Sequence, residues 1–375
     1  MNNYLVLYRK YRPQRFADVI GQEHVVKTLT NAILRDNISH AYLFAGPRGS
    51  GKTTIARLFV KAINCEKRDG FEPCNTCSSC KEIMEFKSID LIELDAASHT
   101  GIDEIREIIE GSKFASVKSK YKAFIIDECH QLSKSAANAL LKTLEEPPPR
   151  VIFLLATTEP HKMIPTIVSR CQRFDFRRLQ IPEIIRKLEF IAQKENVEFE
   201  RSALSLIALN SRGSFRDAES LLDQCLNFIS SLDKNSRIVI KSKDVRDLLG
   251  MAEINEVARF VDVILSKDAK EAITFLNSLL ESGLDLQEFL KTLIFYFRQI
   301  LLIKIHPYFL KTDDMRLVFE EAEKMKEQAG KFSLQELQKI IETLVEAENK
   351  MKYSFIFQLP LELAVLKIIS GKFGE

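Results

Sequence analysis

Short apolar runs alternate with amphipathic segments from Ala41 to about Phe176. Between the runs, apolar residues recur at helical spacing, as in Ile55, Leu58 and Ala62. A parallel sheet is covered by helices on both faces, so its strands read as continuous apolar runs. We therefore expect an α/β domain with a parallel sheet, whose strands are Ala41–Ala45, Leu91–Leu94, Ala123–Ile126, Val151–Ala156 and Gln172–Phe176.

The strand pattern ends at Leu179, and the rest of the chain reads as helical. Pro182 is typical of a helix start, and two more helices are expected at about Arg201–Ser211 and Phe215–Ile229. The polar stretch Ser230–Asp244 is expected to be a linker, and apolar faces predict helices near 252–266, 268–281, 285–305, 313–329, 333–353 and 358–371. The pattern predicts three domains, over residues 1–178, 179–243 and 244–375.

Composition narrows the class of protein. Hydrophobic residues make up 46% of the 375 positions and charged residues 28%, which is ordinary for soluble domains. The net charge of +2 gives no overall signature of nucleic-acid binding, so contacts with DNA would come from local patches. The N-terminal residues are interrupted by Arg9, Lys10, Arg12 and Arg15, and no apolar run approaches the ~20 residues of a membrane span. We expect a cytoplasmic protein without a membrane partner.

The segment after the first strand matches a phosphate-binding P-loop: Gly, four residues, then Gly-Lys-Thr. Its glycines let backbone N–H groups turn toward phosphates, and the following helix adds a favourable dipole. Lys52 is expected to reach the β- and γ-phosphates of ATP, and the Thr53 hydroxyl to bind Mg²⁺. A glycine-rich turn without a ligand is the alternative. The predicted ATP-binding residues here are Gly46, Pro47, Arg48, Gly49, Ser50, Gly51, Lys52, Thr53 and Thr54.

Two acidic residues, Asp127 and Glu128, follow the apolar strand Ala123–Ile126. A carboxylate at a strand tip can hold Mg²⁺, which is the role expected of Asp127. Glu128 can orient or deprotonate the attacking water. A surface Asp-Glu pair at a strand end is common, but an intact P-loop about 75 residues upstream favours the catalytic interpretation.

Four of the seven cysteines lie within sixteen residues of one another: Cys65, Cys74, Cys77 and Cys80. Four thiolates can bind one tetrahedral Zn²⁺, and a closed shell of four protein ligands is typical of a structural metal. An iron–sulfur cluster and a set of free cysteines are the alternatives.

The motifs together resemble the bacterial clamp-loader γ/τ family of AAA+ ATPases, in which the P-loop helix leads into a Cys-x₈-Cys-x₂-Cys-x₂-Cys insertion. The resemblance covers residues 4 to about 225 closely, whereas the helical remainder fits by length and class. The matching segments are Tyr8–Pro13, Phe16–His24, Glu93–Ser98, Asn138–Pro148, Leu155–Thr158 and Ser169–Cys171.

The resemblance implies roles for further residues. Thr158 would be sensor 1, Arg170 the arginine finger that acts on ATP of a neighbouring subunit, and Arg216 sensor 2. An ordinary surface ion pair is the alternative for each arginine. The residues implied in cradling adenine are Tyr8, Arg12, Pro13 and Val19.

The resemblance also implies an activity and partners. Such a chain would use ATP to open the sliding clamp and place it on a primed DNA junction. It would work in a five-membered ring with δ and δ′ subunits, inside the DNA polymerase III holoenzyme but without a polymerase site. The implied fold is an AAA+ domain with a zinc insertion, a three-helix lid and an all-α collar. Arg106, Lys142 and Lys162 would face DNA.

Three features depart from the family pattern. Cys129 precedes His130, and the segment His99-Thr100-Gly101 has fewer basic residues than in some relatives. The sequence ends at Glu375 without a Pro-rich or basic extension, as expected for a short γ form.

Two other classes of protein stay open. A δ′-like scaffold is disfavoured by the intact P-loop. A branch-migration or fork-repair ATPase is disfavoured by the cysteine cluster and by Ser169-Arg170-Cys171.

Overall fold

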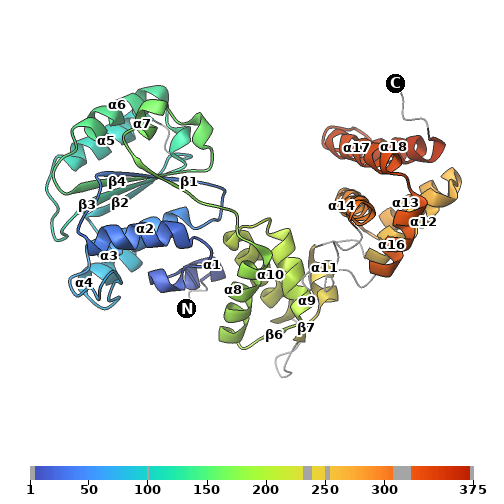
Figure 1. Ribbon diagram of the computed structural model, residues 1–375, viewed down its shortest axis with the longest axis horizontal. Helices are drawn as coiled ribbons and strands as arrows, with labels where there is room; N and C mark the ends of the chain where they lie inside the picture. The colour runs from blue at the N-terminus through green and yellow to red at the C-terminus, as the bar shows by residue number, and fades with distance from the viewer. Residues whose placement is uncertain (1–4, 99–100, 231–238, 250–253, 307–321, 372–375) are drawn as a thin grey trace. The chain divides into compact units, whose positions relative to one another are not determined.

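The computed structural model describes residues 5–98, 101–230, 239–249, 254–306 and 322–371 (Figure 1). The chain divides into two compact units. Unit 1 comprises Met1–Ile191 and Ala208–Asp223, and unit 2 comprises Ala192–Ile207 and Gln224–Glu375.

A five-stranded sheet forms the centre of unit 1. Its strands lie in the order β2-β3-β4-β1-β5, and every pairing is parallel. The middle strands β1 and β4 are buried along their whole length, which explains their uninterrupted apolar sequences. The predicted parallel α/β sheet is confirmed, with strands β1 (Ala41–Ala45), β2 (Leu91–Asp95), β3 (Lys122–Asp127), β4 (Val151–Thr157) and β5 (Gln172–Asp175).

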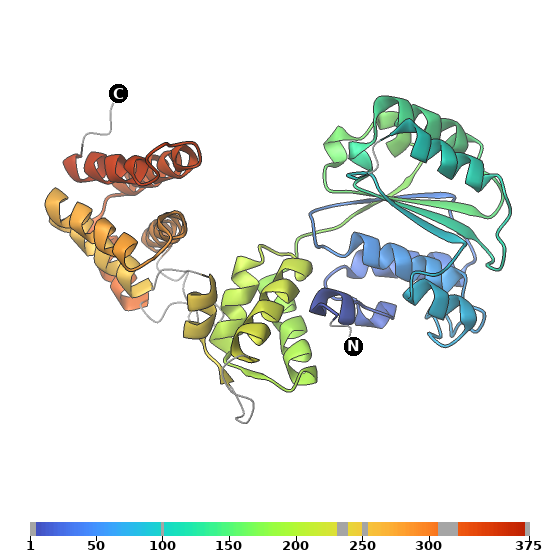
Figure 2. The same cartoon turned by 180° about the vertical axis from the view of Figure 1, so that it is seen from behind.

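Helices cover both faces of this sheet (Figures 1 and 2). Side chains of β1 alternate between two cores, since Tyr42 and Phe44 pack in one and Ala41 and Leu43 in the other. The first core is shared with α2 (Glu23–Leu34), α3 (Lys52–Ile63) and α4 (Ser78–Met84), and the second with α5 (Ile102–Ser112), α6 (Lys134–Glu145) and α7 (Pro165–Val168).

Short elements connect these layers. The N-terminal segment carries α1 (Leu7–Lys10) and the 3₁₀ turn η1 (Phe16–Asp18), while η2 (Cys129–Gln131) and η3 (Pro160–Lys162) follow β3 and β4. The three helices expected after Leu179 are present as α8 (Ile181–Lys194), α9 (Arg201–Asn210) and α10 (Phe215–Ser230), and the division between the two units runs through them.

Two expectations for this region were wrong. Strand structure does not end at Leu179, because β6 (Glu198–Phe199) pairs in parallel with β7 (Val239–Ile240). The linker expected over Ser230–Asp244 lies partly outside the described residues, and the part that is described contains β7 and the start of α11 (Ser242–Leu249). Short strands of two residues leave no apolar run for a sequence pattern to reveal.

The remaining helices of unit 2 pack around α14 (Leu286–Ile305), whose buried residues include Phe289, Phe297 and Ile300. Side chains cap three of these helices, because Asp268, Asp285 and Ser333 each accept a backbone N–H bond at a helix start. The predicted helices are confirmed within the described residues as α12 (Ile254–Ser266), α13 (Ala269–Glu281), α14, α16 (Ala322–Lys331), α17 (Leu334–Met351) and α18 (Leu359–Ser370). The first part of the helix expected near 313–329 lies outside the described residues.

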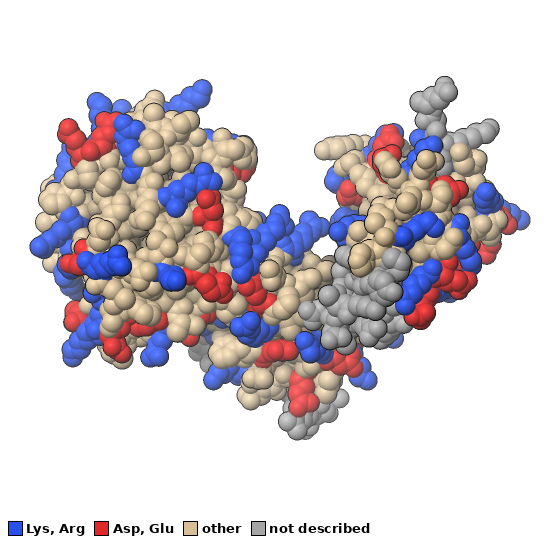
Figure 3. All heavy atoms as spheres, in the orientation of Figure 1, with Lys and Arg blue, Asp and Glu red and all other residues tan. Residues whose placement is uncertain are grey.

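Lysine and arginine are interspersed with aspartate and glutamate over the face of each unit that Figure 3 shows, as the nearly neutral net charge of +2 suggests. Among the residues that the structure describes, no helix has both the length and the apolar character needed to cross a membrane.

Candidate nucleotide-binding site

A cavity of about 740 Å³ opens at the carboxyl edge of the sheet, entirely within unit 1. The loop after β1, the tips of β3 and β4, the N-terminal segment and α10 all contribute to its lining. Ligands of open α/β sheets bind at this edge, where the carboxyl ends of the strands meet. The predicted site residues that line the cavity are Tyr8, Arg12, Pro13, Val19, Arg48, Gly49, Ser50, Gly51, Lys52, Thr53, Thr54, Asp127, Glu128, Thr158 and Arg216.

The P-loop backbone depends on glycine at two positions. Gly51 has a φ of +98° and immediately precedes α3. Gly49 has a φ of +73°, and a Cβ there would lie 1.9 Å from Ser214 Oγ. The Phe215 amide also donates to Gly49 O at 3.2 Å, so the start of α10 packs directly on the loop.

Lys52 is a buried cation in the lining of the cavity, with 6% of its surface exposed. Its Nζ donates to the carbonyl oxygens of Gly46 at 2.8 Å and Pro47 at 2.9 Å. Burial lowers the pKa of Lys52, while the carboxylates of Glu128 and Asp127 oppose that shift. Gly46 and Pro47 thus contact Lys52 rather than line the cavity themselves.

Thr53 and Asp127 meet between α3 and the tip of β3. The Thr53 hydroxyl donates to Asp127 Oδ2 at 2.7 Å. A hydroxyl and a carboxylate this close offer two hard oxygen ligands, which is the donor set that suits Mg²⁺. The two residues therefore fit a magnesium site beside the P-loop.

Glu128 and Thr158 also meet. Glu128 Oε2 accepts bonds from the Thr158 amide at 3.1 Å and from its hydroxyl at 2.7 Å. The Glu128 backbone is left-handed, with a φ of +46°, which is uncommon for a residue with a side chain and often marks functional positions. This arrangement joins the tips of β3 and β4 through one carboxylate.

Another part of the cavity lining is aromatic and basic, and consists of Tyr8, Arg12 and Arg216. The Arg216 guanidinium lies 5.0 Å from the centroid of the Tyr8 ring, a distance at which a cation is attracted to the ring face. Arg12 is half-buried, and its Nη1 has no hydrogen-bond partner. Burial lowers the pKa of Arg12 to about 10, and the positive charge of Arg57 is the second largest cause of this shift.

Sequence reasoning missed two buried ionisable residues of the cavity lining. Lys187 of α8 and Glu219 of α10 line the cavity and are 7% and 6% exposed. Burial raises the pKa of Glu219 to about 7, against the opposing charges of Lys187 and Arg12. Burial also lowers the pKa of Lys187, whose Nζ donates to Tyr11 O at 2.9 Å. The spacing of Glu219 three residues after Arg216 on one helix face was the available signal.

Arg170 does not line the cavity. Its Nη2 pairs with Glu145 Oε1 at 2.6 Å and its Nη1 donates to Thr166 O at 2.8 Å, at the end of α7. The Arg170 side chain is 32% exposed. Arg170 is therefore placed away from the P-loop of its own chain.

The four clustered cysteines converge, since their sulfur atoms all lie within 4.8 Å of one another. Backbone amides point at three of the sulfurs: Cys74 N at Cys65 Sγ, Cys77 N at Cys74 Sγ and Cys80 N at Cys77 Sγ. Four thiols in this arrangement fit one tetrahedral Zn²⁺.

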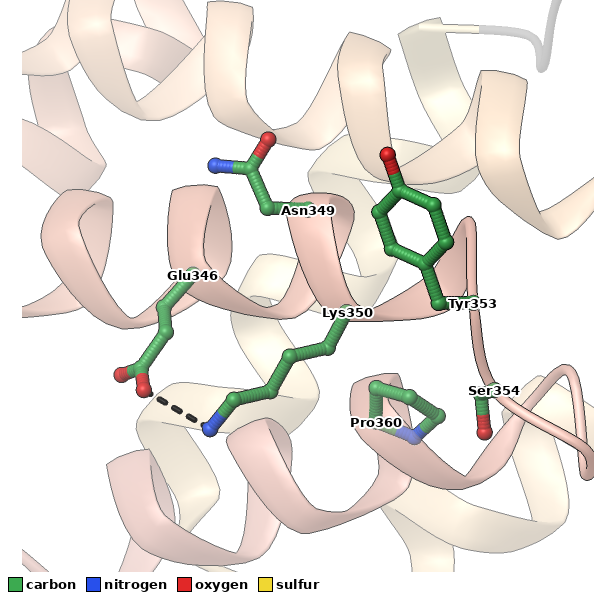
Figure 4. Close-up of a pocket in the computed structure, with 6 residues that line it drawn as sticks. All are labelled: Glu346, Asn349, Lys350, Tyr353, Ser354 and Pro360. Atoms are coloured by element: carbon green, nitrogen blue, oxygen red, sulfur yellow. Dashed lines mark hydrogen bonds and ion pairs between the residues drawn. The ribbon is translucent and has the colours of Figure 1, made fainter.

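A second cavity, of about 520 Å³, lies in unit 2 beside the end of α17 (Figure 4). Glu346 and Lys350 form an ion pair of 2.7 Å on one side of it, and Tyr353 stands on the other. None of the predicted site residues lies there. The first cavity is the candidate functional site.

Two of the features that depart from the family pattern lie in the middle of the chain, at Cys129 and at His99-Thr100-Gly101. Cys129 is buried in the core beneath the sheet tip, and His130 Nδ1 lies 3.0 Å from Thr157 Oγ1. His99 and Thr100 lie outside the described residues.

Solved structures give distant matches. Thermotoga maritima RuvB, a Holliday junction branch migration motor, is 19% identical with a TM-score of 0.48, covering 68% of this chain and 79% of that one. A Bacillus subtilis DNA clamp loader delta protein is 17% identical with a TM-score of 0.39, and the match covers 92% of this chain and 99% of that one.

Sequence comparisons are much stronger. Family profiles described as "DNA polymerase III, delta subunit", "DNA polymerase III clamp loader subunit, ATPase lid domain" and "DNA polymerase III subunits gamma and tau domain III" match residues 21–180, 183–230 and 240–372. The tau subunit of Bacillus subtilis is 44% identical over 98% of this chain, and the chain spans 63% of its length. The Escherichia coli tau subunit is 36% identical over 98% of this chain, and the chain spans 56% of its length. The gamma subunit of Buchnera aphidicola from Acyrthosiphon pisum is 36% identical over 98% of this chain and 99% of its own. The chain therefore belongs to the family of DNA polymerase III gamma and tau subunits.

Proposed function

We propose that this chain is an AAA+ ATPase subunit of a bacterial clamp loader, which uses ATP to open the sliding clamp and place it on primed DNA. The observation that carries the proposal is the convergence of Lys52, Thr53 and Asp127 in one cavity at the carboxyl edge of the sheet. A subunit that did not use nucleotide would have no need for this combination of cation, hydroxyl and carboxylate.

The phosphates of ATP would lie over the start of α3. Lys52 would exchange its two carbonyl acceptors for the β- and γ-phosphates, which are stronger partners for an ammonium group. Thr53 and Asp127 would hold Mg²⁺, whose charge offsets that of the phosphates. The amides of the P-loop add further donors at the helix N-terminus.

Glu128 would act on the attacking water. In the structure Thr158 holds the Glu128 carboxylate through two hydrogen bonds. A γ-phosphate would give the Thr158 hydroxyl another acceptor, and the carboxylate would then be free to accept a bond from water. The Thr158–Glu128 contact thus supports sensor 1 and general-base roles for the two residues.

Adenine would lie against the N-terminal segment, between Tyr8, Arg12, Pro13 and Val19. Arg216 of α10 lines the same cavity and would reach the nucleotide from the lid, which is the sensor 2 role. Its contact with the Tyr8 ring gives the guanidinium a second position when no phosphate is near.

Arg170 would complete the ATP site of a neighbouring subunit. It lies outside the cavity of its own chain and is partly exposed, as a group that acts across an interface must be. This role requires assembly, for which we propose a five-membered ring with δ and δ′ subunits.

The domain boundaries at 178 and 243 are proposed to separate the AAA+ domain, the lid and the collar that joins subunits. The cysteine cluster would hold a structural Zn²⁺. We place the activity in the cytoplasm, where bacterial replication takes place, and assign no polymerase chemistry to this chain.

Three basic side chains are proposed to contact DNA phosphates from the centre of the ring. Arg106 and Lys162 are 64% and 55% exposed, and each is paired with an acid on its own helix turn, Asp103 and Glu159. Lys142 is exposed on α6. Exposed pairs of this kind contribute little to stability, so these cations can turn to phosphates at low cost.

Nucleotide binding by the isolated chain tests the proposal against a δ′-like scaffold. Titration calorimetry with Mg–ATP should show binding to the wild type, and Lys52→Ala should weaken it strongly. If the wild type binds no nucleotide, the ATPase assignment is wrong and the scaffold class is correct.

A further inference from the structure

The insertion that carries the cysteine cluster holds the N-terminal segment directly. Glu72, which lies between Cys65 and Cys74 in the sequence, accepts two backbone hydrogen bonds. Its Oε2 accepts from the Phe16 amide and its Oε1 from the Ala17 amide, both at 2.9 Å. Charge-assisted bonds to two consecutive amides fix the orientation of a backbone as well as its position.

An aromatic contact accompanies these bonds. The Phe71 ring lies edge-on to the Phe16 ring, with centroids 6.3 Å apart. Phe16 is 2% exposed and belongs to the core beneath the sheet. The insertion therefore contacts η1 through both a polar and an apolar side chain.

The segment held in this way lines the nucleotide cavity. Asp18, Val19 and Ile20 follow Ala17 immediately, and Pro13 precedes the same turn. On the other side, Lys61 of α3 donates to the Gln14 carbonyl at 2.9 Å and to its side-chain oxygen at 2.8 Å. Residues 13–20 are thus anchored by one cation from the P-loop helix and one carboxylate from the insertion.

Glu72 lies in a loop whose two ends are brought together at the cysteine cluster. Asp69 and Glu72 exchange two backbone hydrogen bonds, at 3.1 and 2.8 Å, which form a tight turn between Cys65 and Cys74. Cys65 and Cys74, at the two ends of the loop that contains this turn, both belong to the cysteine cluster. A loop closed at its ends has few conformations, so it can present one carboxylate at a fixed place.

We propose that Glu72 is a positioning residue for the nucleotide site, through which the cysteine-cluster insertion sets affinity for the adenosine part of the ligand. Glu72 touches no ligand itself. It keeps η1 ordered before binding, so adenosine meets a preformed wall. Without Glu72, ordering this segment would cost conformational entropy at the moment of binding. The phosphates bind to the P-loop, which Glu72 does not contact. This inference rests on the proposed function only in taking the ligand to be an adenine nucleotide.

Two ligands separate the two ends of the cavity. Mg–ATP uses both the adenosine wall and the P-loop, whereas inorganic tripolyphosphate with Mg²⁺ uses the P-loop alone. The test variants of the full chain are Glu72→Gln, which keeps the side-chain size but only one acceptor oxygen, and Glu72→Ala. Glu66→Gln is the matched control, because Glu66 lies in the same insertion but accepts from Ser78 and Ser79.

We expect Glu72→Gln to lower the affinity for Mg–ATP about tenfold, equivalent to ~1.4 kcal/mol of binding free energy. Its affinity for tripolyphosphate should stay within about twofold of the wild-type value. Glu72→Ala should do the same or more, and Glu66→Gln should match the wild type. Elemental analysis should find the same metal content in all four proteins. If Glu72→Ala loses metal, the isosteric Glu72→Gln decides the question.

Unchanged ATP affinity in Glu72→Gln would overturn the inference, and so would an equal loss for ATP and tripolyphosphate, which would indicate a general structural role. Amide hydrogen exchange gives a second readout that needs no ligand. The amides of Phe16 and Ala17 should exchange faster in Glu72→Gln than in Glu66→Gln, and equal rates would contradict the proposal. If the wild type binds no nucleotide, the proposed function fails, while the exchange experiment still tests the contact.

Discussion

Replacing Arg170 by alanine removes a partly exposed guanidinium that makes local contacts only. Its ion pair with Glu145 joins side chains that are 32% and 49% exposed. Exposed pairs of this kind contribute about 0–1 kcal/mol to folding. Loss of the bond to Thr166 O adds a similar amount at most. The folded structure therefore predicts a small loss of stability, at most about 2 kcal/mol in all.

The functional effect should be much larger. An arginine finger contributes ~10³–10⁵ in rate, equivalent to ~4–7 kcal/mol of transition-state stabilisation. Arg170→Ala should thus keep its fold, its ATP binding and its assembly, and lose DNA-stimulated hydrolysis. Glu145→Ala is the matched control, because it removes the same ion pair and leaves the guanidinium in place. This control should keep most of the ATPase activity.

Mixing two inactive chains tests whether Arg170 acts across a subunit boundary. Lys52→Ala lacks a functional P-loop but keeps its finger, and Arg170→Ala has the opposite defect. In mixed rings some interfaces join an intact P-loop to an intact finger, so ATPase activity should partly return. If mixed rings form and no activity returns, or if Glu145→Ala is as inactive as Arg170→Ala, Arg170 is a structural residue of its own subunit.

Elemental analysis should find about one zinc per chain, as a single four-thiolate site requires. Replacing one of the clustered cysteines should lower thermal stability more than it lowers the turnover number. A protein without zinc whose four clustered thiols are all freely titratable would contradict this prediction. Glu219 should make stability depend on pH, because its raised pKa of about 7 means that the folded state binds a proton more tightly than the unfolded state, where a glutamate pKa is ~4.3. Stability is lost as the pH rises from about 4 to about 7. Glu219→Gln should therefore stabilise the protein by as much as ~4 kcal/mol at about pH 8 and little at about pH 4. An equal shift of the melting temperature at both pH values would refute the assignment. Neutralising Arg106, Lys142 and Lys162 together should weaken DNA-stimulated ATPase in a salt-dependent way without changing basal turnover, and an equal loss of basal turnover would make them structural.

The sheet was predictable because each strand is short, apolar and buried on both faces. The strand Ala41–Ala45 was predicted to the residue, and the other four differ by a residue or two at their ends. Strand ends were less certain, since Asp95 and Asp127 extend β2 and β3 although a polar residue normally ends an apolar run. The pair β6–β7 was not predictable, because its pairing depends on the approach of two distant segments and not on local pattern.

The lining of the cavity was predictable where a motif has a fixed spacing, as in the P-loop and the acidic pair at the tip of β3. Lys187 and Glu219 carry no such motif, because they reach the cavity only through the packing of α8 and α10 near the N-terminal segment. Glu72 is similar. In the sequence it is one acid among many, and only the fold places its carboxylate against two amides of η1.

The most direct test of the proposed clamp-loading activity is the ATP turnover of this chain assembled with the proposed δ and δ′ partners. Turnover is measured with and without sliding clamp and primed DNA. The proposal predicts that clamp and primed DNA together raise ATP hydrolysis well above the rate of the assembly alone, and that Lys52→Ala abolishes the stimulated rate. A turnover that is indifferent to clamp and DNA, or one that survives in Lys52→Ala, would contradict the account.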